Sequence, residues 1–87
     1  MYVILVYDVN VERVARVLKV GRKYLTWVQN SVLEGELTRS QFERLKQELR
    51  EVIDEAKDSV LFYRLRSAEW LEREHLGVKK GEPTWVL

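Results

Sequence analysis

Tyr-Val-Ile-Leu-Val-Tyr at residues 2–7, followed directly by Asp8, is the stretch of sequence that decides the fold. Its residues are β-branched, aromatic or aliphatic, and no polar residue alternates with them. A short apolar run of this kind predicts a strand that is buried on both faces and central in its sheet. The other elements are placed around this strand.

A helix is expected immediately after the strand. Asn10 can serve as its N-cap, and a helical spacing of apolar residues persists until Gly21 weakens it. The apolar residues at this spacing are Val11, Val14, Ala15 and Leu18. They predict one amphipathic helix.

Four further elements follow. Residues 25–37 predict two short paired strands, with a tight turn or bulge at Asn30-Ser31 and a second irregularity at Gly35. Thr38 and Gln41 form a capping box that begins a second helix. The apolar face of that helix comprises Phe42, Leu45, Leu49, Val52, Ile53 and Ala56. Residues 59–66 predict a last strand. Its two faces carry Leu61, Tyr63 and Leu65 on one side and Val60, Phe62, Arg64 and Arg66 on the other.

The order strand, helix, strand pair, helix, strand predicts an α+β fold, a ferredoxin-like βαββαβ sandwich over residues 1–67 with both helices on one face of the sheet. A central strand that is apolar on both sides conflicts with a bare second face, and an exposed apolar patch usually marks an interface. A homodimer packed sheet to sheet resolves the conflict. Residues 68–87 are expected to form a C-terminal arm that adds a strand to the partner's sheet edge, with a loosely ordered tail as the alternative.

The bulk composition narrows the class of protein. The chain has 87 residues, which suits one domain, and it contains no cysteine, which excludes disulfides, thiolate metal sites and cysteine nucleophiles. Its longest apolar run is too short for a membrane span, so a cytoplasmic protein without a membrane partner is expected. The net charge of +1 favours no particular partner.

Asp8 is the best candidate for chemistry, because the strand fixes its backbone while its carboxylate reaches the strand end. An aspartate at a strand-to-helix junction can instead cap the helix or bind loop amides, and position alone leaves both roles open. Asn10 favours the chemical role, since it can supply the cap itself. Mg²⁺ commonly binds through one or two carboxylates, so a dimer axis near Asp8 would complete a site. Such a metal supports phosphodiester hydrolysis without a protein nucleophile.

Two groups of basic residues are candidates for phosphate contact. Arg13, Arg16, Lys19 and Lys23 lie away from the apolar side of the first helix. Arg64 and Arg66 share one face of the last strand. Together they could follow a nucleic-acid backbone, although for any one of them ordinary surface charge is the favoured explanation.

The remaining distinctive residues favour structural roles. His75 is the one histidine and has no second imidazole or thiol as a partner, so a solvated side chain is expected. Trp27, Trp70 and Trp85 are interpreted as anchors in the core, an interface and the tail.

Three segments in this order and spacing resemble the CRISPR-associated protein Two family, the small partner in the spacer-acquisition complex of prokaryotic adaptive immunity. The segments are Tyr-Val-Ile-Leu-Val-Tyr-Asp-Val at 2–9, Trp-Val-Gln-Asn-Ser-Val-Leu-Glu-Gly-Glu-Leu at 27–37 and Asp-Ser-Val-Leu-Phe-Tyr-Arg-Leu at 58–65. The resemblance covers residues 1–67. One departure is Leu33, where the family often has Phe, a change that affects packing more than chemistry.

The resemblance implies a ferredoxin-like homodimer, Mg²⁺ held between two copies of Asp8, and metal-dependent endonuclease activity in CRISPR adaptation. It also implies that Ser31, Arg13 and Arg16 lie near the nucleic-acid surface. The implied partners are a CRISPR integrase subunit and double-stranded DNA, with single-stranded RNA as a further ligand. Two alternatives stay open, a non-catalytic structural adaptor that bridges integrase dimers and a toxin-like ribonuclease of the same fold.

Overall fold

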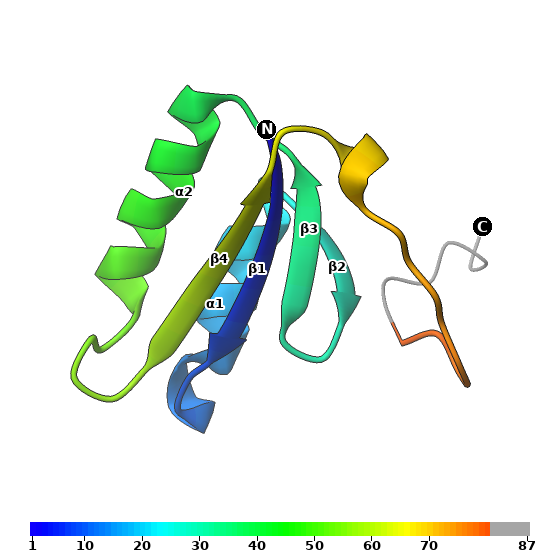
Figure 1. Cartoon of the computed structure of the whole chain (residues 1–87). Coiled ribbons are helices and arrows are strands. Elements are labelled where there is room, and N and C mark those ends of the chain that lie inside the picture. Colours follow the sequence, from blue (N-terminus) through cyan, green and yellow to red (C-terminus); the bar gives the residue numbers. More distant parts are fainter. Residues whose placement is uncertain (81–87) are drawn as a thin grey trace.

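A four-stranded antiparallel sheet carries two helices on one face in the computed structural model, which describes residues 1–80 (Figure 1). The elements are β1 (Tyr2–Asp8), α1 (Val11–Arg22), β2 (Thr26–Gln29), β3 (Val32–Glu36), α2 (Arg39–Val52), β4 (Ser59–Leu65) and the 3₁₀ turn η1 (Ala68–Trp70). This order confirms the predicted ferredoxin-like βαββαβ fold. The predictions for Trp85 and for the last part of the arm lie outside the described residues.

The strand order is β2-β3-β1-β4, so β1 is central as predicted. It pairs antiparallel with both β3 and β4, and Leu5 lies opposite Leu33 on one side and Phe62 on the other. The register also places Asp8 opposite Ser59, at the end of the sheet where α1 begins. No helix within residues 1–80 is long and apolar enough to cross a membrane.

The core lies between the sheet and the helices. Alternate residues of β1 point into it, namely Val3, Leu5 and Tyr7, and they pack with buried side chains from β3 and both helices. The other contributors include Val17, Leu33, Phe42, Leu45 and Leu49. This alternation follows from the two-residue period of a strand, which sends the intervening residues of β1 to the opposite face.

The second face of the sheet is apolar and lacks a helix. Tyr2, Ile4 and Val6 from β1 are only partly buried there. On the same face of β4, Leu61 is 48% exposed and Tyr63 is 54% exposed. The predicted conflict between an apolar strand and a bare face is therefore present in the protein.

The capping box of α2 forms as predicted, because the Gln41 N–H donates to Thr38 Oγ1 and the Thr38 N–H donates to Gln41 Oε1. The prediction that Ala56 lies on the apolar face of this helix is wrong. The helix ends at Val52, and the Asp54 carboxylate accepts a hydrogen bond from the Ala56 N–H. An aspartate that binds a nearby backbone N–H offers the chain an alternative to continuing the helix.

The strand irregularities differ in part from prediction. The turn at Asn30-Ser31 forms, with Asn30 in the left-handed region at φ 41°. The second irregularity lies in β2 between Trp27 and Gln29, whereas Gly35 pairs regularly with Val3. Gly35 instead allows close packing, since a Cβ there would lie 3.3 Å from Leu25 Cδ2.

The segment after β4 turns toward the β2 side of the sheet (Figure 1). Residues 71–75 form one side of a shallow cavity whose other side is the open face of β2, β3 and β1. The Arg73 guanidinium pairs there with Glu34, which also accepts a hydrogen bond from the Tyr2 hydroxyl. Residues 71–80 contain no strand, and His75 is exposed.

Candidate active site

Asp8 is the last residue of β1 and is exposed. The strand alternation places its carboxylate on the open face of the sheet, together with Ile4 and Val6. Its side chain makes no hydrogen bond or ion pair with any other residue in 1–80. Within these residues, Asp8 therefore neither caps α1 nor accepts a hydrogen bond from a loop amide. Its position in the sequence alone had left that role open.

Asp58, which precedes β4, performs that role instead. Its Oδ1 accepts a hydrogen bond from the Asn10 N–H at 3.0 Å, and its Oδ2 accepts one from the Asp54 N–H at 2.8 Å. Asn10 occupies the N-cap position of α1, but its side chain makes no capping bond. The expectation that Asn10 supplies the cap is therefore wrong.

Arg13 is bound to the same carboxylate. Its Nε and Nη2 donate to Asp58 Oδ2 and Oδ1 at 2.5 and 2.9 Å. The Asp58 side chain is 0% exposed and that of Arg13 is 13% exposed. The hydrogen bonds from Arg13 hold the pKa of Asp58 well below its usual range, and those bonds raise the pKa of Arg13. The guanidinium predicted to contact nucleic acid is thus held inside the protein by an ion pair.

Sequence reasoning missed Asp58. A usable signal was nonetheless present, because the ferredoxin-like order pairs the first strand with the last in antiparallel fashion. That pairing places the residue before the last strand beside the residues that follow the first strand. An aspartate at such a position can reach the free N–H groups at the start of the first helix.

Ser31 lies at the same end of the sheet as Asp8. The N–H of Tyr7 donates to the Ser31 carbonyl at 3.1 Å, which holds the β2–β3 turn beside the end of β1. Arg16 is exposed about one turn along α1 from Arg13. The structure therefore brings Ser31 close to the Asp8 end of β1 and leaves Arg16 open to solvent on the helix that starts there.

Arg64 and Arg66 lie elsewhere. Arg64 is opposite Val3 and Leu65 is opposite Tyr2, so both arginines belong to the end of the sheet away from Asp8. The length of β4 separates the two ends by roughly 20 Å at ~3.3 Å per residue. Arg64 turns toward the helices, with its guanidinium carbon 5.6 Å from the centre of the Phe42 ring. Lys23, another predicted cation, is paired with Glu48.

Comparison with known proteins identifies the family. The sequence model described as CRISPR associated protein Cas2 matches residues 1–73. The chain belongs to the Cas2 family. This is the family that the segments at 2–9, 27–37 and 58–65 resemble.

Curated Cas2 relatives match along nearly all of the chain. A protein of Thermotoga maritima named CRISPR-associated endoribonuclease Cas2 is 57% identical over 87 residues and is covered completely, as is this chain. A protein of Pyrococcus furiosus with the same name is 55% identical over 81 residues, with 93% of each chain covered. Both relatives therefore align with this chain along nearly their whole length.

Solved Cas2 structures have the same fold. One described as the crystal structure of cas2 has a TM-score of 0.84 at 48% identity and covers 92% of this chain and 90% of its own. The Streptococcus pyogenes Cas2 structure at pH 6.5 has a TM-score of 0.78 at 38% identity and covers 88% of this chain and 100% of its own. The ferredoxin-like sandwich of this chain is thus the Cas2 fold.

A carboxylate oxygen is a ligand that Mg²⁺ prefers, and Asp8 offers one that is exposed and has no partner among residues 1–80. Within residues 1–80, no group of three or more His, Asp or Glu side chains is arranged to hold a metal ion. Within the described part of the chain, Asp8 therefore belongs to no such group. The donor chemistry fits Mg²⁺ if a second copy of the chain supplies the other carboxylate.

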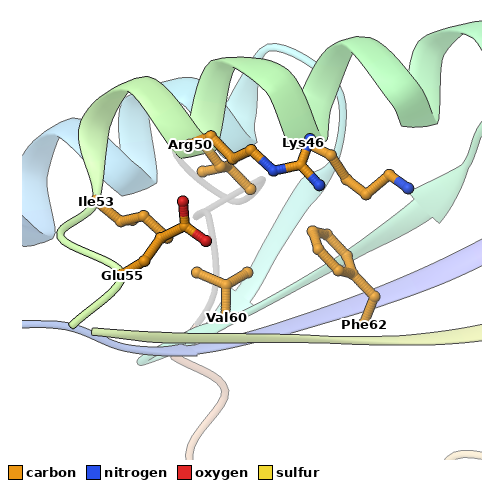
Figure 2. A pocket seen from close by; sticks show the side chains of 7 residues that line it. Lys46, Arg50, Ile53, Glu55, Val60 and Phe62 are labelled. Atoms are coloured by element: carbon orange, nitrogen blue, oxygen red, sulfur yellow. The ribbon is translucent and has the colours of Figure 1, made fainter. Parts of the chain in front are cut away.

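A separate cavity of about 170 Å³ lies between α2 and β4, on the helix-covered side of the sheet (Figure 2). It is lined by Lys46, Leu49, Arg50, Ile53, Glu55, Val60 and Phe62. The side chains of Val60 and Phe62 project toward the cavity from β4, and those of Lys46 and Arg50 lie along it on α2 (Figure 2). Asp8 projects from the opposite face of the sheet, so this cavity is not part of the candidate site.

Proposed function

We propose that this Cas2 protein is a homodimer that binds nucleic acid during CRISPR adaptation and hydrolyses phosphodiesters with Mg²⁺ at paired Asp8 carboxylates. The observation that carries the proposal is the exposed Asp8 carboxylate, which has no partner within residues 1–80 and lies at the end of the central strand on the bare face. A carboxylate held by rigid backbone but free of internal bonds is suited to bind a ligand from outside the chain.

The homodimer is supported by the open face of the sheet. Leu61 and Tyr63 are about half exposed and adjoin Ile4 and Val6, which together make a contiguous apolar surface. Apolar patches of this kind usually mark interfaces in soluble proteins. In the proposed dimer the two sheets pack face to face, and the two-fold axis passes near the end of β1. Each copy then supplies one Asp8.

The proposed chemistry requires little of the protein beyond positioning. Bound Mg²⁺ would lower the pKa of a water molecule and neutralise charge on the phosphodiester. The two Asp8 carboxylates would hold the ion, while Ser31 and Arg16 would bind and orient the phosphates on either side of the scissile bond. No side-chain nucleophile is needed.

The substrate is proposed to be RNA for cleavage and double-stranded DNA for binding. The curated relatives carry the name endoribonuclease, which supports RNA as the substrate class of the site. Arg64 and Arg66 lie roughly 20 Å from Asp8, and Arg64 lies on the helix-covered face, so they would contact a stretch of duplex other than the one at Asp8. Binding through separated arginines depends on backbone charge and is expected to weaken steeply with salt.

The test is cleavage of RNA and DNA by the purified dimer with and without Mg²⁺, for the wild type and for Asp8→Asn. The proposal predicts metal-dependent cleavage in the wild type and a loss of about 10²-fold or more in the variant, with the dimer intact. Glu55→Gln is the matched control, because it removes one exposed carboxylate from the other face and should leave cleavage unchanged. Unchanged cleavage by Asp8→Asn would refute the site.

A second candidate function is a non-catalytic adaptor that bridges two dimers of a CRISPR integrase. It is favoured by the solitary position of Asp8 within the described part of a protomer, where no other carboxylate completes a metal site. Spacer acquisition in cells separates the two functions. Full acquisition by Asp8→Asn would favour the adaptor, whereas a parallel loss of acquisition and cleavage would favour the nuclease.

Residues 68–87 are proposed to be an arm that contacts a second chain. Within the described part of this arm, Trp70 is 72% exposed and Leu76 is 95% exposed, which is unfavourable for large apolar side chains that meet only water. A partner protomer or the integrase subunit would bury them. The last strand ends at Leu65, and residues 71–80 contain no further strand, which supports a boundary near residue 67.

A further inference from the structure

The buried ion pair between Arg13 and Asp58 lies directly behind the candidate site. We propose that this pair positions Asp8 for metal binding, an inference that rests on the proposed function of Asp8. The Asp58 carboxylate accepts hydrogen bonds from two backbone N–H groups, those of Asn10 and Asp54. Through these bonds it joins the start of α1 to the loop that precedes β4.

Asp58 controls the backbone of Asp8 from two directions. Along the chain, Asn10 follows Asp8 by two residues, and its N–H is held by Asp58 Oδ1. Across the sheet, Ser59 follows Asp58 directly and is paired with Asp8 in the antiparallel register. One carboxylate therefore fixes both the segment that continues from Asp8 and the strand that lies beside it.

Arg13 fixes the position of Asp58 in turn. Its two N–H groups bind both carboxylate oxygens, which sets the plane and the direction of the carboxylate. A lysine would offer a point charge rather than a planar fork and would leave that direction free. The Arg13 side chain is anchored in the first turn of α1, so the pair ties this helix to the loop over residues 53–58.

Asp8 depends on this support because it has none of its own. Its carboxylate is not bound by any residue in 1–80, so the protein sets only its starting point, through the backbone position and the Cα–Cβ direction at the end of β1. A shift of about 1 Å at a catalytic group can reduce a rate by about 10²-fold. In a site shared between two copies, a substitution displaces the Asp8 carboxylate of each protomer, so both metal ligands are misplaced.

The test compares Arg13→Lys and Asp58→Asn with the wild type in Mg²⁺-dependent cleavage. We expect the Mg²⁺ concentration for half-maximal cleavage to rise about tenfold and kcat to fall by about 10-fold to 10²-fold, with the dimer retained. Glu48→Gln is the control. It removes the ion pair with Lys23 and one of the two oxygens that accept from Lys23 and Tyr24 at the other end of α1, and it should lower the melting temperature without moving the Mg²⁺ midpoint.

A second measurement does not depend on catalysis. In Arg13→Lys the amide protons of Asn10 and Asp54, which Asp58 binds, should exchange with solvent at least about tenfold faster than in the wild type, and those in Glu48→Gln should not. If Asp8→Asn cleaves normally, the proposed function fails. The amide exchange rates still show whether the Arg13–Asp58 pair holds the backbone beside Asp8. An unchanged Mg²⁺ midpoint together with unchanged exchange in Arg13→Lys would overturn the inference.

Discussion

Asp8 and Asp58 lie at the same end of the sheet but in opposite environments. Asp58 is buried and accepts hydrogen bonds from Arg13, Asn10 and Asp54, whereas the exposed Asp8 has no partner within residues 1–80. The oxygens of Asp58 already accept hydrogen bonds from the protein, whereas those of Asp8 can accept them from a ligand. The division of labour between the two aspartates follows from these surroundings rather than from the residue type.

The lowered pKa of Asp58 predicts a specific sensitivity to acid. A group whose pKa is lower in the folded state contributes stability that is complete above its unfolded value of 3.8 and is lost as the pH falls toward the folded value. The melting temperature of the wild type should therefore fall more steeply below about pH 4 than that of Asp58→Asn. Thermal unfolding followed between about pH 6 and pH 2 checks this. Parallel curves for the two proteins would contradict it.

At the residue scale, the sequence singled out Asp8, whose role in metal binding stays a prediction, but it did not reveal the ion pair of Arg13 with Asp58. Asp8 could be predicted because a polar residue that ends an apolar strand is visible in one dimension. The ion pair of Arg13 could not, since its partner Asp58 is 45 positions away and the pairing depends on strand register. The predicted contacts of Arg16 and Ser31 with nucleic acid stay predictions.

At the element scale, α2 is the helix whose beginning is most clearly encoded. The reciprocal bonds between Thr38 and Gln41 satisfy two N–H groups that would otherwise lack a partner at the helix start. The end of the helix was harder to predict, because Ile53 and Ala56 continue the apolar spacing while the Asp54 side chain binds the Ala56 N–H in a turn. Periodicity reports the buried face of a helix but not the local bond that ends it.

Loss of the cap should weaken the protein measurably. Thr38→Ala removes the side-chain oxygen that accepts from Gln41 and should lower the free energy of unfolding by about 1 kcal/mol. Thr38→Ser keeps that oxygen and serves as the control. Urea unfolding at one fixed protein concentration measures the difference, and equal stability of Thr38→Ala and the wild type would show that the box contributes nothing.

Gly21 and Gly35 were interpreted from the sequence as points where regular structure weakens. Both lie inside regular elements instead, Gly21 in α1 and Gly35 in β3. A Cβ on Gly21 would lie 3.1 Å from Leu33 Cδ2, so the glycine permits close packing of α1 on the sheet. A close approach between elements leaves no signal in the local sequence, which is why both glycines were misinterpreted.

At the scale of the whole molecule, the topology was predictable and the distances were not. The order of elements and the right-handed crossover rule were sufficient for the sheet order β2-β3-β1-β4. The separation of Arg64 and Arg66 from Asp8 required the register of β4 on β1. The course of residues 71–75 beside the open face had no sequence signal at all.

The bare sheet face predicts how the oligomer can be broken. Tyr63→Glu places a charge within the proposed interface, opposite Ile4, where burial without a partner is costly, and should convert the dimer to a folded monomer. Light scattering gives the mass and circular dichroism the fold. Gln47→Glu, which adds the same charge on the exposed side of α2, should stay dimeric. A dimeric Tyr63→Glu protein would place the interface elsewhere.

The most direct test of the paired Asp8 site is the stoichiometry of Mg²⁺ binding, measured by titration calorimetry on the purified dimer. A site shared across the two-fold axis requires one ion for every two chains in the wild type and loss of that binding in Asp8→Asn, with the mass of the dimer unchanged. Binding of one ion per chain, or the same binding in Asp8→Asn, would contradict it.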